Sequence, residues 1–294
     1  MNTTKDTVKR MMGWAKENEN VRIVMLTSSR ANPNAEVDAL SDYDIELYVK
    51  QLESFLESDE WLEGFGAVLV RWPYEPPDNK DRTTRLVLYE DGPRIDFQIK
   101  GVQTLAEVAT APRLPDSHDM GYQVLLDKDG MTKGLKPPTY TAYRTKAPTK
   151  SEYEALVHDF WWDITYVAKY LFRDQLFFAK YMLDDSLHHH YLKTAISWYI
   201  GAQNGWQSNP GTYGRWFKKQ LEPEVWSDIE GTFAASDLAE NWNAMFKAAE
   251  VFGMLASKVG EHLGYAYPFE LGRNVTDYLS ELRRTADSPA GNFR

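Results

Sequence analysis

Two aspartates, Asp42 and Asp44, lie one residue apart at the start of the stretch YDIELYV (43–49), whose alternating apolar residues predict a β-strand. Strand side chains alternate between faces, so both carboxylates point the same way. A third acid, Asp96, interrupts another strand-like stretch, PRIDFQIK (93–100). If these strands are neighbours, three carboxylates converge, and their mutual repulsion favours a cation between them. Mg²⁺ suits such oxygens, and two such ions stabilise the attacking and leaving oxygens of phosphoryl or nucleotidyl transfer.

The short turn TSSR separates a predicted buried strand at 21–27 from these aspartates. Ser28 and Ser29 are small, so their backbone N–H groups can approach a triphosphate closely, and their hydroxyls can donate to phosphate oxygens. Arg30 can pair with phosphate or with the aspartates. A lone Asp-x-Asp is usually a solvated strand end. The combination of strand, small-residue turn, aspartate pair and third strand aspartate favours a nucleotide site instead.

The rest of the chain predicts two halves of different composition. The first half predicts helices at 3–18, 52–65 and 104–110, and strands at 21–27, 43–49, 67–72, 84–90, 93–100 and, as a possible edge strand, 122–127. Asp91-Gly92 predicts a hairpin turn between two of these strands. After a Pro-, Thr- and Lys-rich segment at 136–153, the periodicity predicts helices at 151–173, 174–184, 186–203, 214–221, 223–234, 236–263 and 273–285. We therefore expect domains at 1–148 and 149–294.

Composition restricts the chemistry further. The chain has no cysteine, which excludes disulfides, cysteine metal sites and a cysteine nucleophile. The first twenty residues are charged and carry no signal-type apolar core, and no window reaches the length of a membrane span, so we expect a cytoplasmic protein. The net charge of −10 disfavours nucleic acid and suits either solubility or a polycationic small molecule. Consecutive histidines at 188–190 point about 100° apart on a helix, which argues against a common zinc ion.

The turn, the aspartate pair and the third strand aspartate resemble the nucleotidyltransferase superfamily related to DNA polymerase beta. The stretches FWWDITYVAKYLFRDQLFFA, ISWYIGAQNGW and GYAYPFELGRNVTDYL make the chain similar to the aminoglycoside 6-adenylyltransferases that inactivate streptomycin, over residues 20–285. The resemblance implies an α+β protein, with a mixed-sheet, polymerase-beta-like nucleotidyltransferase domain followed by an all-α helical bundle that helps to form the acceptor site. It also implies Mg²⁺, expected as two ions, with ATP as co-substrate, and AMP transfer to an aminoglycoside hydroxyl, conferring antibiotic resistance.

By this resemblance Asp42 and Asp44 are the metal-binding pair, and Asp96 is a further metal ligand or the general base. Ser29 is the signature serine of the phosphate turn. Ser28 is a departure, because the family usually has glycine there, where it serves for unusual φ and for close backbone approach. The departure bears on the geometry of the turn and so on ATP affinity.

Further residues are candidates for contacts to the acceptor and the phosphates. Glu46 shares a strand face with the aspartates and could bind acceptor ammonium groups or form an ion pair. Lys169 is part of the resemblance and would neutralise phosphate, although a surface lysine fits equally well. Asp163 could pair with an aminoglycoside. Trp162 belongs either to a packed aromatic face or to the acceptor site.

We expect a monomer that binds ATP and a small cationic acceptor and neither nucleic acid nor membranes. Two other functions remain open on the sequence. One is nucleotidyl transfer to a different acceptor, such as a lincosamide or a protein hydroxyl. The other is a non-catalytic homologue that binds nucleotide or drug, to which the serine at position 28 lends support.

Overall fold

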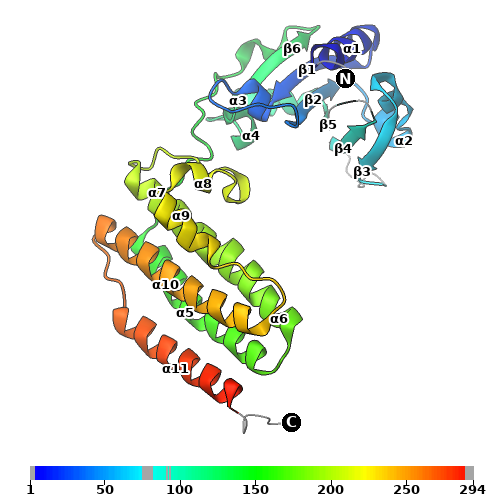
Figure 1. Ribbon diagram of the computed structural model, residues 1–294. Helices are drawn as coiled ribbons and strands as arrows, with labels where there is room; N and C mark the ends of the chain where they lie inside the picture. The colour runs from blue at the N-terminus through cyan, green and yellow to red at the C-terminus, as the bar shows by residue number, and fades with distance from the viewer. Residues whose placement is uncertain (1–3, 75–81, 91, 93, 289–294) are drawn as a thin grey trace. The chain divides into compact units, whose positions relative to one another are not determined.

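The computed structural model describes residues 4–74, 82–90, 92 and 94–288. The chain forms two compact units, Met1–Tyr143 and Arg144–Arg294, with the boundary inside the Pro- and Thr-rich segment (Figure 1). The first unit is an α+β fold and the second is helical.

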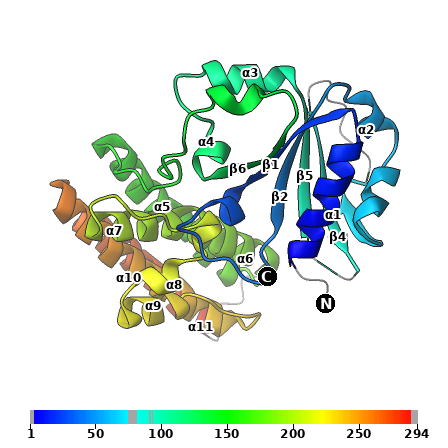
Figure 2. The same ribbon diagram turned by 90° about the horizontal axis from the view of Figure 1, so that it is seen from above.

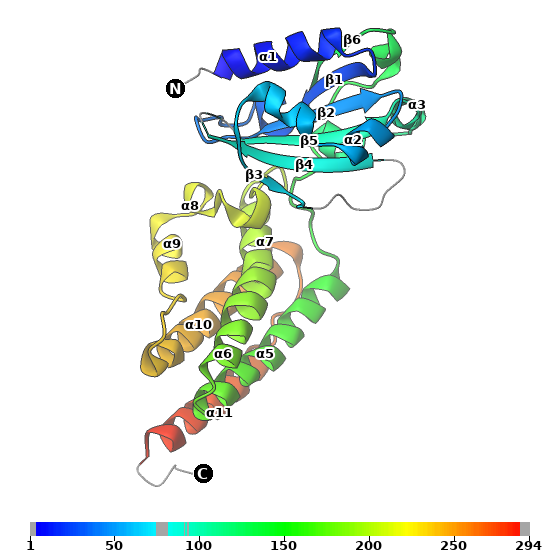
Figure 3. The ribbon, with the colours of Figure 1, turned by 90° about the vertical axis from the view of Figure 1, so that its right-hand side faces the viewer.

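A six-stranded mixed sheet forms the centre of the first unit. Its strand order is β3-β4-β5-β2-β1-β6. The strands are β1 (Val21–Thr27), β2 (Tyr43–Val49), β3 (Val68–Trp72), β4 (Arg82–Tyr89), β5 (Arg94–Gly101) and β6 (Tyr122–Asp127). Only β2 and β5 pair in parallel among the described strands, and β4 and β5 pair antiparallel as predicted, although Asp91 of their expected turn lies outside the described residues (Figure 3). The prediction that β6 is an edge strand is confirmed.

The two faces of this sheet carry different cores. Helices α1 (Thr4–Glu17) and α2 (Glu53–Glu57) cover one face, where Ile45 and Leu47 are buried with an aromatic cluster (Figure 2). The opposite face packs its smaller core against α3 (Gln103–Thr110). Because β2 alternates, its polar residues Asp44 and Glu46 lie on the α3 face.

The single helix predicted at 52–65 is wrong. Helix α2 ends at Glu57, and a 3₁₀ turn follows at Glu60–Phe65. Between them Ser58 is extended, with φ −146° and ψ 141°. Asp59 then accepts a 2.7 Å hydrogen bond from Nε of Arg85, a guanidinium buried in β4. This pairing competes with helix continuation, because it directs the Asp59 carboxylate toward the sheet.

The second unit is built from helices of very different lengths (Figure 1). They are α5 (Lys150–Phe172), α6 (Leu176–Lys180), a π-helical segment (Tyr181–Leu192), α7 (Lys193–Gln203), α8 (Phe217–Gln220), α9 (Pro223–Glu230), α10 (Leu238–Leu263) and α11 (Phe269–Asp287). The predicted break near residue 185 is absent, because the π segment joins α6 to α7. Thr149 and Glu152 form a capping box that starts α5. Across the core, Phe160 stacks on Phe252 at 3.7 Å between ring centroids. Within the described residues no helix is long and apolar enough to cross a membrane.

Candidate functional site

Three carboxylates meet at one end of the β2–β5 pair. Asp44 and Asp96 are register partners in this parallel ladder, and Asp42 precedes β2 by one residue. The guanidinium of Arg94 lies among them, with its Nε 2.9 Å from Asp96 Oδ1 and 3.8 Å from Asp42 Oδ2. We call Asp42, Asp44 and Asp96 the carboxylate row. The predicted convergence of these side chains is therefore present in the sheet.

The electrostatics of the row centre on Asp44. Burial, followed by the charges of Asp96 and Asp42, raises the pKa of Asp44 from 3.8 to about 6. A hydrogen bond from the Ser28 side chain and the charge of Arg94 act in the opposite direction. Crowded like charges that raise a pKa are the condition that a bound cation relieves.

The Ser28–Ala31 turn lies beside the row, directly after β1. Ser28 has φ +59°, in the left-handed region where glycine is favoured. Its backbone N–H donates to the carbonyl of Gly121 at 3.0 Å, and its hydroxyl lies close enough to Asp44 to act against the rise of that carboxyl's pKa. Ser28 thus adopts the conformation for which glycine is used, and its hydroxyl contacts the carboxylate row.

Arg30 is engaged by the loop that leads to the row. Its guanidinium donates to the carbonyls of Asp38, Ser41 and Asp42, the shortest bond being 2.7 Å to Ser41, and its central carbon lies 4.0 Å from the Tyr43 ring centroid. Arg30 therefore holds the backbone carbonyl of Asp42 in place. These bonds use Nε and Nη2 of the guanidinium, so a contact between Arg30 and phosphate would fall to Nη1.

Glu46 lies on the predicted face but is buried, with 1% of its surface exposed. Its carboxylate contacts Lys100 Nζ at 2.6 Å, Tyr48 Oη at 2.7 Å and His118 Nε2 at 2.8 Å. Burial alone would raise the pKa of Glu46, but His118 and Lys100 lower it to about 2. This enclosure argues against the predicted contact between Glu46 and an acceptor, because the carboxylate is already fully engaged.

The candidates of the helical unit share the outer side of α5. Trp162 is 65% exposed and packs edge-on against Tyr166. The Lys169 ammonium lies 5.5 Å from the ring centroid of Tyr166. Asp163 accepts a 2.8 Å hydrogen bond from the Tyr191 hydroxyl. The helix therefore offers an exposed aromatic surface with one carboxylate and one ammonium group.

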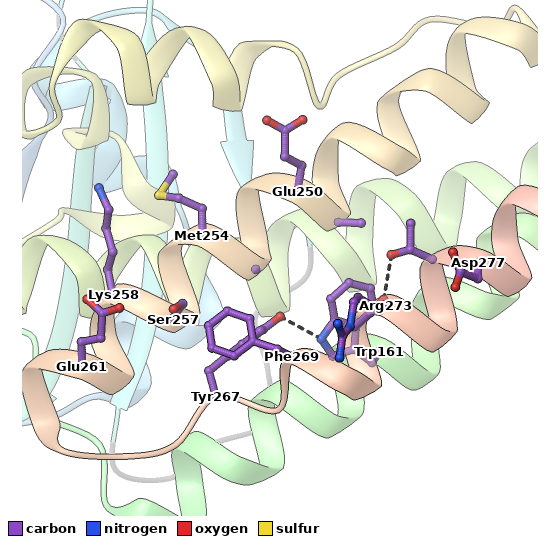
Figure 4. A pocket seen from close by; sticks show the side chains of 14 residues that line it. Trp161, Glu250, Met254, Ser257, Lys258, Glu261, Tyr267, Phe269, Arg273 and Asp277 are labelled. Atoms are coloured by element: carbon purple, nitrogen blue, oxygen red, sulfur yellow. Dashed lines mark hydrogen bonds between the residues drawn. The ribbon is translucent and has the colours of Figure 1, made fainter.

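A separate pocket of about 540 Å³ lies between α10 and α11, with Trp161 of α5 in its wall (Figure 4). The Trp161 indole N–H donates to the Tyr267 hydroxyl at 3.1 Å. The charged residues of its lining are Glu250, Glu261, Asp277, Lys258 and Arg273. Since both signs of charge are present, the lining does not select a cationic ligand over an anionic one.

The sequence model of the family described as streptomycin adenylyltransferase matches residues 1–282. The chain belongs to this family. It is 29% identical over 287 residues to an aminoglycoside 6-adenylyltransferase of Bacillus subtilis, covering 96% of this chain and 98% of the relative. Similar enzymes of Campylobacter jejuni and Staphylococcus aureus are each 28% identical, covering 97% and 95% of this chain and 97% and 98% of the relatives.

Among solved structures, an aminoglycoside 6-adenyltransferase from Bacillus subtilis aligns with 96% of this chain and 99% of its own, at 24% identity and a TM-score of 0.45. Family membership makes the protein an enzyme of the nucleotidyltransferase class. The possibility of a non-catalytic binding protein is therefore set aside.

The donor set of the carboxylate row suits a hard divalent cation such as Mg²⁺, which prefers carboxylate oxygens. The raised pKa of Asp44 supports this fit, since the crowded charges lack full compensation. In the described part of the chain these carboxylates are not gathered into a ready-made metal cluster, so a cation would have to replace the contacts that Arg94 makes with Asp42 and Asp96. Arg94 lies where it contacts two carboxylates of the row.

Sequence reasoning missed three residues of this region, Arg94, His118 and Gly121. Arg94 could have been found, because a residue two positions before Asp96 shares its strand face. His118 and Gly121 reach the site from another segment, so their placement depends on long-range packing. A lone histidine next to an aspartate in the sequence carries no signal of that packing.

Proposed function

We propose that the protein transfers AMP from ATP to a hydroxyl of an aminoglycoside, with streptomycin as the expected acceptor and antibiotic resistance as the consequence. The observation that carries the proposal is the carboxylate row beside the Ser28–Ala31 turn, in a chain that belongs to the streptomycin adenylyltransferase family. Three bacterial relatives, each similar to this chain over nearly its full length, are named for this activity, which supports the same chemistry here.

The residues of the first unit would divide the work as follows. Ser28 and Ser29 would receive the triphosphate, and Asp42 and Asp44 would hold Mg²⁺, which when bound supplies positive charge to the phosphate oxygens. The acceptor hydroxyl would attack the α-phosphorus, the bond to pyrophosphate would break, and Asp96 would take the hydroxyl proton. General-base assistance of this kind is worth about 10²–10⁴-fold in rate.

The exposed side of α5 would serve the acceptor and the phosphates. Trp162 offers an exposed ring face, which attracts guanidinium and ammonium groups, and Asp163 adds a carboxylate for them. Lys169 would neutralise phosphate charge. These residues would suit a polycationic acceptor better than a lincosamide, which does not carry several positive charges.

The test is a panel of acceptors. The purified protein is incubated with ATP and Mg²⁺ together with streptomycin, other aminoglycosides or a lincosamide. Pyrophosphate release and the acceptor mass are measured. We expect release with streptomycin and a mass increase of one adenylyl group. Turnover with a lincosamide and with no aminoglycoside would contradict the assignment of the acceptor, and release with no acceptor at all would contradict the proposal.

A further inference from the structure

A buried polar cluster lies one register row below the carboxylate row on the same face of β2. Its centre is Glu46, which contacts His118, Lys100 and Tyr48. Tyr48 and Lys100 belong to the sheet itself, whereas His118 comes from α4 (Asp116–Asp119), a short helix between β5 and β6. The 2.8 Å contact between His118 Nε2 and Glu46 Oε2 therefore fixes a separate segment of chain onto the sheet.

The His118 side chain is enclosed at this contact, with 2% of its surface exposed. Its Nδ1 atom has no hydrogen-bond partner among the described residues, so Glu46 is the polar anchor that the ring has. The neighbouring Asp119 accepts the N–H groups of Thr139, Thr141 and Ala142, which fixes the other side of the segment. Because the buried imidazole is hydrogen-bonded through one nitrogen alone, its position on the sheet depends on the contact with Glu46.

The segment that His118 anchors leads directly to the serine turn. The N–H of Gly121 donates to the His118 carbonyl at 3.0 Å, and the Gly121 carbonyl accepts the N–H of Ser28 at 3.0 Å. Gly121 has φ +133°, and a Cβ atom there would lie 2.9 Å from the carbonyl oxygen of Ala31. The turn therefore packs backbone against backbone on Gly121, which leaves little freedom for either to move alone.

We infer that the Glu46–His118 pair positions the Ser28–Ala31 turn for the triphosphate of ATP, acting through Gly121. His118 and Gly121 are then positioning residues, since neither needs to touch the nucleotide. Loss of the pair removes one of the two anchors of the 116–121 segment and so loosens the carbonyl that holds the Ser28 N–H. The inference rests on the proposed function, because it assumes that this turn receives ATP.

The test separates nucleotide binding from catalysis and from stability. Binding of a non-hydrolysable Mg²⁺–ATP analogue is measured by calorimetry without acceptor, together with the Tm and with KM and kcat for ATP and streptomycin. For His118→Ala we expect analogue affinity to fall and ATP KM to rise about tenfold or more. Streptomycin KM should change by less than about twofold, because the acceptor does not use the turn. His118→Gln, which can return one nitrogen donor to Glu46, should recover most of the affinity.

Two further variants make the test independent of one substitution. Gly121→Ala acts at the other end of the same path and leaves Glu46 paired, and it should weaken the analogue in the same way. Tyr48→Phe is the matched control: it removes a Glu46 partner on the sheet without releasing the 116–121 segment, so analogue affinity should stay within about twofold.

The outcomes are distinct. Unchanged analogue affinity in both His118→Ala and Gly121→Ala would overturn the inference. So would an equal loss in Tyr48→Phe, since the effect would then follow from the buried cluster as a whole. If the wild-type protein failed to bind the analogue, the proposed function would fail and the inference with it.

Discussion

At the scale of single residues, the proposed chemistry depends most on Asp44 and Ser28. Asp44 is crowded by Asp42 and Asp96 and shielded from water, and the Ser28 side chain contacts it from a left-handed backbone position. Each feature is unfavourable for the isolated fold, and in the proposed function each serves the binding of nucleotide and metal. Both therefore give predictions that separate stability from activity.

Asp44 should make the protein less stable as the pH rises. Its pKa in the folded protein, about 6, lies above the ordinary aspartate value of 3.8, so the folded state binds the proton more tightly than the unfolded state. This contribution is complete below about pH 4 and is lost as the pH rises through about 6. Above that pH, Asp44→Asn should unfold at a higher urea concentration than the wild type. Its free energy of unfolding should be higher by at most about 3 kcal/mol. Added Mg²⁺ should narrow the difference, and a variant less stable than the wild type at neutral pH would contradict the crowding.

Replacing Ser28 should reveal whether its departure from glycine is tolerated. A non-glycine residue in this conformation costs about 1–3 kcal/mol, which Ser28→Gly relieves while removing the hydroxyl that contacts Asp44. We expect ATP KM to fall or stay the same, with streptomycin KM unchanged. Ser28→Ala is the control, because it lacks the hydroxyl and keeps the strain. A large loss of kcat in both variants would mean that the hydroxyl makes a necessary contact.

At the scale of elements, the sheet brings the carboxylate row together. The parallel pairing of β2 and β5 places Asp44 opposite Asp96, and the alternation of β2 sends its apolar residues to the α1 face. Arg85 is the least expected residue of the sheet, because its guanidinium occupies a strand position that is only 1% exposed. It donates to Asp59, Thr83 and the carbonyls of Thr84 and Phe55, and so joins α2 to the sheet.

Arg85→Met should destabilise the first unit by about 3 kcal/mol, because it removes the buried guanidinium that pairs with the Asp59 carboxylate. The matched control is Arg71→Met, which removes the other cation of Asp59 from a side chain that is 36% exposed. We expect the control to cost less than about 1 kcal/mol. Urea unfolding of both variants measures this contrast, and equal losses would mean that burial does not determine the strength of these pairs.

Local patterns in the sequence were enough to predict the strands and the three aspartates of the site. The features that they did not predict depend on contacts between residues far apart in the sequence. Alternation placed Asp42 and Asp44 on one face, and the third strand aspartate at 96 followed from a polar residue in an apolar run. The break of the predicted helix at 52–65 depends on Arg85, which is far from it in sequence. The burial of Glu46 likewise depends on His118, and no periodicity in β2 reveals that partner.

At the scale of the whole molecule, charge and the division into two units set the conditions for binding. The net charge of −10 favours the approach of a polycation and opposes that of ATP without its metal. The carboxylate row lies in the first unit, and Trp162, Asp163 and Lys169 lie in the second. Because the proposed reaction uses residues of both units, neither unit should catalyse it alone.

The acceptor KM should therefore rise with ionic strength. The Debye length falls from about 10 Å at 0.1 M salt to about 3 Å at 1 M, which screens the attraction between an acidic protein and a cationic acceptor. Initial rates at several NaCl concentrations, with Mg²⁺–ATP saturating, measure the effect. The ATP KM at fixed Mg²⁺ is the internal comparison. A streptomycin KM that is flat across this range would limit the acidic surface to a role in solubility.

The most direct measurement of the central claim, that the carboxylate row transfers AMP to an aminoglycoside, is single-turnover adenylylation of streptomycin by the wild type and Asp44→Asn. Both proteins are mixed with Mg²⁺ and ATP labelled in the α-phosphate, after circular dichroism and thermal unfolding have shown that each is folded. The wild type should move the label onto streptomycin with release of one pyrophosphate per turnover. The folded variant should be slower by at least about a hundredfold. Label transfer by Asp44→Asn at close to the wild-type rate would contradict the role of the row.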